Sequence, residues 1–205
     1  MKILTSLLLS LITLYGPAQQ PDTTWYKDGR VKAVGNSINE ARTGLWKYFY
    51  PNGQLNSELN FTDDELDGDQ KYYSFEGILI GREFYKMGLM EDSATYYYPS
   101  GRLEKQGVYK NGLYNKLWRF YYENGNLKRI GGYVEGSPNG MWKFYYENGS
   151  LNQVGELING LENGTWKYFD EDEILTYEGN WMNGKEVGQW YFFKNGKKKK
   201  WKNFD

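Results

Sequence analysis

The sequence predicts an all-β protein: an elongated, twisted antiparallel β-sheet built from tandem 24-residue β-hairpin repeats. The first observation is periodicity, because a Trp recurs at intervals of 24 residues, as Trp118, Trp142, Trp166 and Trp190. The second is that each Trp begins an aromatic run that leads to a turn sequence such as Asn-Gly, the signal for a type I′ hairpin turn. The third is the absence of helical periodicity beyond the first segment. These observations indicate hairpins stacked in a linear array.

The chain begins with an apolar run over residues 3–14, which is preceded by a lysine and followed by small residues up to Ala18. This pattern predicts a signal peptide over residues 1–18, cleaved after Ala18. A membrane-spanning helix would need about 20 apolar residues, so a permanent anchor is less favoured, as is a buried first element. We therefore expect a short linker over residues 19–23 and an exported protein, periplasmic or extracellular.

Residues 24–205 are expected to form a single array of about seven hairpin repeats with partial caps, because each unit joins the next without a linker. A second turn is expected in each unit, for example around residues 136–140. Such a sheet exposes an edge at each end. The lysines at residues 197–200 and Lys202 are expected to protect the last edge by their charge, and a patch for anionic lipid or nucleic acid is the alternative interpretation.

One face of each hairpin is expected to carry the stacking core, because side chains alternate along a strand. In one unit this face should hold Trp166, Tyr168, Leu175, Gly179 and Trp181. The missing side chain of the Gly leaves room for a neighbouring ring to lie flat over the backbone. We therefore predict a structural spine formed by Trp46, Trp118, Trp142, Trp166 and Trp190, interrupted by Gln70 and Ala94.

A second aromatic column with the same period is expected on the opposite face. A single-layer sheet cannot bury both of its faces, so two roles are open for this column. Its rings could be covered by neighbouring Lys and Glu stems, or they could form a binding stripe with large contact area and low side-chain entropy. The candidate binding residues are Tyr73, Tyr97, Tyr121, Tyr145 and Phe169.

The composition removes most catalytic chemistry. The chain has no His and no Cys, which excludes the most common general base, a thiolate nucleophile and nearly all zinc sites. The acidic segment over residues 63–69 resembles a calcium loop, but Ser74 stands where the closing Glu would be needed. We predict no catalytic residue, no metal site and no cofactor. With 25 basic and 26 acidic residues, general nucleic-acid binding also lacks its electrostatic driving force.

From Gly107 to Gly196 the chain repeats Gly-x-Trp-x-aromatic-aromatic, then Asn-Gly-x-Leu, then Gly-x-aromatic-x-Asn-Gly. These residues resemble the MORN-variant repeat, in particular the YwqK-type antitoxin family built from it. The resemblance covers nearly the whole chain beyond the N-terminal segment and is degenerate at Gln70 and Ala94. It implies the repeat fold and, for the YwqK type, an antitoxin role in which the sheet masks a toxin protein.

The leading expectation is a non-catalytic exported repeat protein that acts as a protein-binding module or scaffold through an aromatic sheet face. The first alternative is the antitoxin of a YwqK-type toxin–antitoxin system, with a toxin as the partner. The second is a cell-wall or carbohydrate-binding module, because Trp-x-Tyr-Tyr followed by Asn-Gly is also similar to the aromatic repeats of choline- and glucan-binding proteins. Nucleic acid is not expected as a partner, and membrane contact, which depends on the lysines after Gly196, is less favoured.

Overall fold

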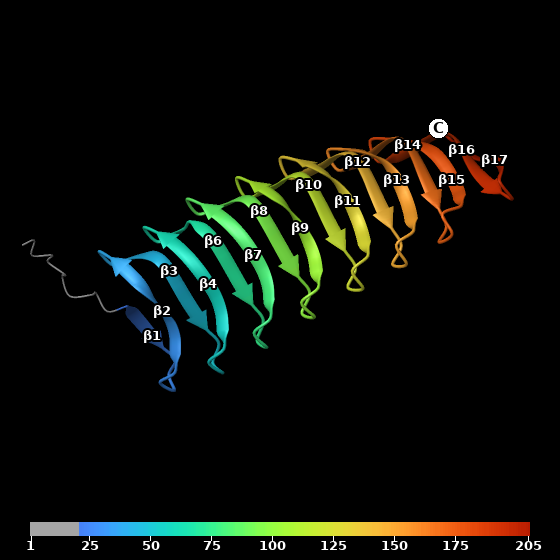
Figure 1. Cartoon of the computed structure of the whole chain (residues 1–205). Coiled ribbons are helices and arrows are strands. Elements are labelled where there is room, and N and C mark those ends of the chain that lie inside the picture. The colour runs from blue at the N-terminus through green and yellow to red at the C-terminus, as the bar shows by residue number, and fades with distance from the viewer. Residues whose placement is uncertain (1–20) are drawn as a thin grey trace, which may run out of the picture.

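The prediction of an all-β fold is confirmed. A computed structural model describes residues 21–205, so the predicted signal peptide over residues 1–18 lies outside the described residues. In the described part of the chain every regular element is a β-strand, and 17 strands form one antiparallel sheet, rather than the 14 or so that two strands per repeat would give. Figure 1 shows the hairpins side by side in chain order along an elongated, twisted array.

Successive strands pair with one another along the chain, except that β4 pairs with both β5 and β6. The strands are β1 (Asp22–Trp25), β2 (Val31–Ile38), β3 (Ala41–Phe49), β4 (Leu55–Thr62), β5 (Glu65–Leu66), β6 (Gly68–Tyr73), β7 (Leu79–Lys86), β8 (Leu89–Tyr97), β9 (Leu103–Lys110), β10 (Leu113–Tyr121), β11 (Leu127–Val134), β12 (Ser137–Tyr145), β13 (Leu151–Ile158), β14 (Leu161–Phe169), β15 (Leu175–Met182), β16 (Lys185–Lys194) and β17 (Lys197–Phe204).

The turn at Asn148-Gly149 is not the type I′ turn that its sequence predicts. The N–H of Tyr146 donates to the carbonyl of Ser150 at 2.9 Å, and only Gly149 takes a positive φ, of 96°. This is a three-residue loop that ends in a left-handed Gly, the second common hairpin geometry. The Asn148 Oδ1 accepts a hydrogen bond from the N–H of Ser150 at 2.9 Å, which stabilises this loop instead.

The type I′ turns lie at the other ends of the strands. Asn159 and Gly160, between β13 and β14, take φ angles of 52° and 82°, the positive pair that this turn requires. Asn195 and Gly196 form the same turn between β16 and β17, with φ angles of 52° and 68°. One repeat after Gly149, Glu173 takes the left-handed position that ends the three-residue loop, with a φ of 59°.

The second turn of each unit is shorter than expected, because Gly140 lies inside β12. The turn is Glu135-Gly136, and β12 resumes at Ser137. Gly140 takes a φ of 83° within a bulge where three residues of β12 lie opposite Gly131 alone. The extra residues bend the strand locally, and Trp142 is the last of these three residues.

The five tryptophans of the predicted spine, here called the Trp spine, are all buried on one face of the sheet. Their exposed fractions are 6% or less, and Trp118 is completely buried. The Trp118 ring lies over Gly107 of the preceding strand, so a Cβ at Gly107 would come within 2.1 Å of the ring. The Nε1–H of Trp118 donates to the carbonyl of Val108 at 2.9 Å. Each spine Trp therefore packs directly over the backbone of a Gly, and this packing is possible only because Gly has no side chain.

The rings form a continuous ladder in the second half of the array. Ring centroids are 5.8 Å apart for Trp142 and Phe144, 6.2 Å for Phe144 and Trp166, and 6.4 Å for Trp166 and Tyr168. The ladder then reaches Trp190, 5.9 Å from Tyr168. Because each ring contacts the next repeat as well as its own, this ladder joins the hairpins into one cooperative core.

The expectation that Leu175 shares the Trp face is wrong. A bulge between Tyr168 and Phe169 shifts the register, so that Leu175 pairs with Phe169 rather than lying in line with Gly179. Cross-strand partners point to the same side of a sheet. Leu175 therefore lies with the second aromatic column, on the face opposite the Trp spine.

In the two repeats that lack the spine Trp, other side chains replace its contacts. Gln70, which is completely buried, donates from Nε2 to the carbonyl of Asn60 at 3.1 Å, the same acceptor position that the indole N–H uses elsewhere. In the next repeat Ala94 replaces the Trp and Glu83 replaces the Gly. Glu83 is 8% exposed, and the hydroxyl of Tyr96 donates to its Oε1 at 2.6 Å. The Glu83 side chain thus takes the place of the Trp ring that this repeat lacks.

This exchange predicts strong coupling between positions 83 and 94. Ala94→Trp alone should lower the free energy of unfolding by about 1–3 kcal/mol, because Glu83 occupies the side of the sheet where the ring would lie. Glu83→Gly combined with Ala94→Trp should recover most of this loss by recreating the Gly–Trp pair. Urea unfolding of the double-mutant cycle measures the coupling, and purely additive effects would contradict this account.

Candidate binding face

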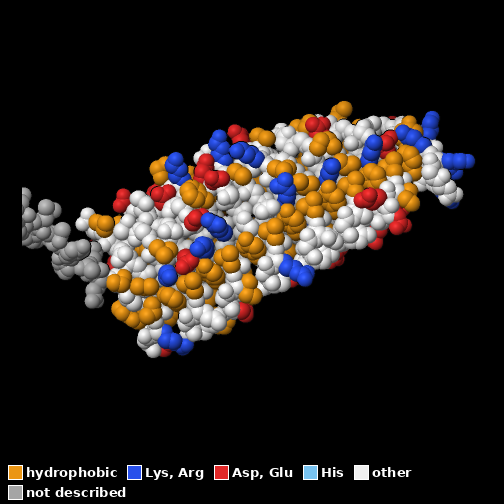
Figure 2. Space-filling view, viewed as in Figure 1, with side chains coloured by type: hydrophobic (Ala, Val, Ile, Leu, Met, Phe, Trp, Pro, Cys, Tyr) orange, Lys and Arg blue, Asp and Glu red, His pale blue; other side chains and the backbone are white. Residues whose placement is uncertain are grey.

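The face opposite the Trp spine carries a stripe of aromatic and leucine side chains, here called the Tyr-Leu face. Each member of the second aromatic column pairs across the strands with the leucine that follows the hairpin. The pairs are Phe49–Leu55, Tyr73–Leu79, Tyr97–Leu103, Tyr121–Leu127, Tyr145–Leu151 and Phe169–Leu175. All of these side chains are half-buried. The five candidate binding residues thus lie in one row, and Figure 2 shows a hydrophobic band along the array.

The backbone of this stripe is fixed by a third aromatic position that the sequence interpretation did not use. The hydroxyl of Tyr122 donates to the carbonyl of Tyr145 at 2.8 Å, and Tyr146 donates to Phe169 at the same distance. The same bond is made by Tyr26, Tyr50 and Tyr98 to the carbonyls of Phe49, Tyr73 and Tyr121. These bonds join each repeat to the next, so the stripe is held on a rigid surface. The recurrence of Tyr at 24-residue intervals was the available signal.

A row of basic side chains flanks the stripe. Toward the two ends of the array the lysines of this row are paired, since Lys47 lies 3.6 Å from Glu58 and Lys167 lies 4.0 Å from Glu178. In the middle, Arg119 and Lys143 pair across the strands with Ile130, and neither is in any ion pair of the described residues. The central part of the face therefore combines apolar side chains with two positive charges that are in no ion pair, while the Glu173 carboxylate accepts a hydrogen bond from the N–H of Leu151 at 2.8 Å.

Burial raises the pKa of several tyrosines. Burial, strengthened by the nearby Glu83 carboxylate, raises the pKa of Tyr85 to about 12. Burial on the Trp-spine face also raises the pKa of Tyr168 to about 12. On the Tyr-Leu face, burial raises the pKa of Tyr145, with a smaller contribution from Glu173.

These shifts predict loss of stability in alkali. Between about pH 10 and pH 12 an unfolded Tyr releases its proton while Tyr85 and Tyr168 still hold theirs, so the folded state binds more protons. The free energy of unfolding should therefore be fully retained below about pH 10 and fall as the pH rises toward 12. Urea midpoints measured across this range check the prediction. Tyr168→Phe should reduce the slope, and an equal slope in both proteins would contradict the assignment.

The described residues hold no group of three or more His, Cys, Asp and Glu side chains that could bind a metal ion. In the acidic segment over residues 63–69, Asp63 and Asp64 form the turn between β4 and β5, and Asp64 makes an ion pair with Arg42 at 2.6 Å. Among residues 21–205 there is no helix long and apolar enough to cross a membrane.

The match to a family model agrees with this geometry. The model of the MORN repeat variant matches residues 42–63, 93–111, 114–135, 138–159 and 162–183, which together cover just over half of the chain. The chain belongs to this family of MORN repeat variants. The unmatched gap from residue 64 to 92 contains Gln70 and the Glu83 exchange, where the repeat departs most from its pattern.

Comparison with curated proteins gives no match. Among solved structures, the chain is similar to part of a TcdB2–TccC3–Cdc42 crystal structure, with 13% identity over 88% of this chain and 12% of that chain, and a TM-score of 0.24. It is also similar to part of a Photorhabdus luminescens Tc holotoxin pore, with 12% identity over 85% of this chain and 12% of that chain, and a TM-score of 0.22. Likenesses with TM-scores this low support no inference about function.

Proposed function

We propose that this chain is a non-catalytic, exported repeat protein that binds another protein through the Tyr-Leu face. The observation that supports the proposal most is the continuous stripe of half-buried rings and leucines on that face. No second layer covers it in the described part of the chain. Tyr side chains on a rigid surface provide large contact area at low entropy cost, which suits them to protein recognition.

The centre of the face indicates the chemistry of the partner. Tyr121 and Tyr145 lie on neighbouring hairpins there, and Arg119 and Lys143 lie beside them without an acidic partner. A surface of this kind favours a protein that presents apolar side chains flanked by Asp or Glu, because complementary charges accelerate association and select the partner. We therefore place the main contact over β10, β11, β12 and β13.

The test is capture of a partner by the full chain with an affinity tag after Asp205, followed by titration of the purified pair. Tyr145→Ala and Lys143→Glu should each weaken binding at least about tenfold, the effect expected of a central contact residue. Lys185→Glu is the matched control, since it makes the same charge change at the exposed start of β16. Equal affinity for the two Lys variants would overturn the assignment of this face.

The compartment of the partner separates the two leading candidates. Extracts of periplasm and cytosol are used in parallel, and a near-stoichiometric partner from the periplasm supports the exported binding module. A partner found only in cytosol favours the second candidate, a YwqK-type antitoxin that masks a toxin, which rests on the repeat motif from Gly107 to Gly196. If neither extract yields a protein, quenching of Trp fluorescence by cell-wall glycans would favour the carbohydrate-binding alternative instead.

A further inference from the structure

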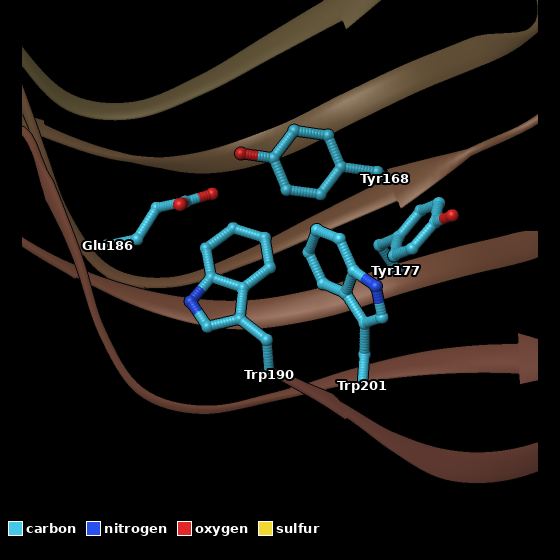
Figure 3. A pocket seen from close by; sticks show the side chains of 5 residues that line it. All are labelled: Tyr168, Tyr177, Glu186, Trp190 and Trp201. Atoms are coloured by element: carbon cyan, nitrogen blue, oxygen red, sulfur yellow. The ribbon is translucent and has the colours of Figure 1, made fainter. Parts of the chain in front are cut away.

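The last two hairpins form an open pocket on the face of the Trp spine. It has a volume of about 270 Å³, and its walls are Tyr168, Tyr177, Glu186, Trp190 and Trp201, from β14, β15, β16 and β17. Figure 3 shows the four aromatic rings grouped together. The Glu186 carboxylate points toward the Tyr168 hydroxyl. The pocket thus combines aromatic walls with a single acidic group.

The rings are inclined to one another and so enclose a concave surface. The Tyr177 and Trp201 centroids are 5.2 Å apart with an interplanar angle of 61°, and Trp190 and Trp201 are 6.3 Å apart at 66°. In the described residues, none of the contacts between a Lys or Arg and a ring involves these four rings. Of the lysines of β17, Lys198 is paired with Glu178 on the other face, and Lys202 lies over Phe204, a ring next to Trp190 and Trp201. Lys199 lies on the pocket face beside Phe192 but over none of the four rings.

An earlier repeat shows what this arrangement can hold. Three periods before the pocket, the equivalents of Tyr168, Tyr177, Glu186 and Trp190 are Tyr96, Lys105, Tyr114 and Trp118. There the Lys105 Nζ lies 4.3 Å from the ring centroid of Tyr96 and 5.7 Å from that of Tyr114. It also donates a hydrogen bond to the Tyr114 hydroxyl at 3.0 Å. This position of the repeat therefore holds an ammonium group against aromatic rings.

In the pocket, the positions equivalent to Lys105 and Tyr114 carry different residues. Tyr177 replaces the lysine, so this position supplies no cation, and Glu186 replaces a tyrosine, so a negative charge is added. Trp201, which is 51% exposed, adds a further ring from β17. Electron-rich ring faces together with a carboxylate attract a cation more strongly than either feature alone.

We propose that this pocket binds an alkylated ammonium group. A primary ammonium has three N–H groups, ring faces offer no strong acceptor, and the Tyr168 hydroxyl already accepts from the Nε1–H of Trp181 at 3.1 Å, so Glu186 and the tyrosine hydroxyls would replace only part of its hydration. A methylated ammonium makes no such demand, and its methyl groups pack against the rings. The pocket lies on the face opposite the Tyr-Leu face, so this inference goes beyond the proposed protein binding and does not depend on it.

The experiment compares choline with its neutral isostere 3,3-dimethylbutan-1-ol, by calorimetry and Trp fluorescence on the full chain. Choline should bind and quench fluorescence, whereas the isostere should bind at least about fivefold more weakly, because only the charged ligand gains the cation–π term. Glu186→Gln and Trp201→Ala should each weaken choline binding by about 5- to 30-fold. Trp25→Ala, which removes an exposed ring at the other end of the array, is the matched control and should have no effect.

Two results would overturn the proposal: absence of choline binding, or equal binding of choline and the isostere. Both are measured on the unmodified chain, so they do not depend on whether a variant folds. A flotation assay with phosphatidylcholine vesicles then identifies the source of the group. Flotation that free choline competes away assigns a lipid headgroup, and choline binding without flotation assigns a free small cation.

Discussion

Trp118→Ala should lower the free energy of unfolding by about 3–5 kcal/mol, the usual cost of removing a fully buried Trp. The ring has no exposed surface and lies over Gly107. Its ring centroid lies 4.1 Å from that of Tyr114 and 5.0 Å from that of Tyr109. Its removal therefore leaves a cavity that the rigid strands cannot close. The loss of the bond from its Nε1–H to the carbonyl of Val108 adds to this cost. Urea unfolding followed by circular dichroism measures the change.

Trp25→Ala is the matched control for this prediction. Trp25 lies on β1 and is 60% exposed, so its removal should change stability by less than about 0.5 kcal/mol. A Trp118→Ala protein that unfolds at the same urea concentration as the Trp25→Ala protein would contradict the role of the Trp spine.

Gly131→Ala should destabilise the chain by about 3 kcal/mol, although it adds only one methyl group. A Cβ at Gly131 would lie 2.1 Å from Cδ2 of the Trp142 ring, and the ring cannot withdraw because it is 2% exposed between neighbouring strands. The position also has no positive φ, so the expected loss comes from this clash alone rather than from backbone strain. Thermal unfolding of the variant measures it.

Gly81→Ala provides the comparison for the same change in the same sheet. A Cβ at Gly81 would have its first contact at 3.4 Å, with Tyr72, so it fits without displacing a neighbour. Alanine there should be neutral or stabilising, because it reduces the conformational entropy of the unfolded chain. If Gly81→Ala and Gly131→Ala were equally destabilised, close packing of the Trp ring over Gly131 would not be the cause.

The period of the repeat was sufficient to predict the sheet, because a Trp at 24-residue intervals with alternating neighbours fits only stacked hairpins. The turn types were not predictable in the same way. Asn-Gly satisfies both a type I′ turn and a three-residue loop, and the choice at Asn148-Gly149 depends on the register of the flanking strands. The predicted face of Leu175 was wrong for a related reason, because one bulge reverses the side of the sheet on which the following residues lie.

The candidate binding residues could be placed in one column from the sequence, but their neighbours could not. The pairing of Tyr145 with Leu151 depends on the bulge beside the hairpin. Tyr177 and Trp201 lie one period apart, at the same position of neighbouring repeats. The pocket was still beyond sequence analysis, because the contact between these two rings depends on the irregular register of the last hairpin. Comparing Lys105 with Tyr177 across repeats was the signal that pointed there.

Hydroxyl-radical footprinting of the chain with and without its captured partner tests the central claim most directly, because it reports the accessibility of individual side chains. The account predicts protection of Tyr121 and Tyr145 on the Tyr-Leu face, with Trp25 and Trp201 unchanged. Protection confined to Trp201 and Tyr177 on the face of the Trp spine, with Tyr121 and Tyr145 unchanged, would contradict it.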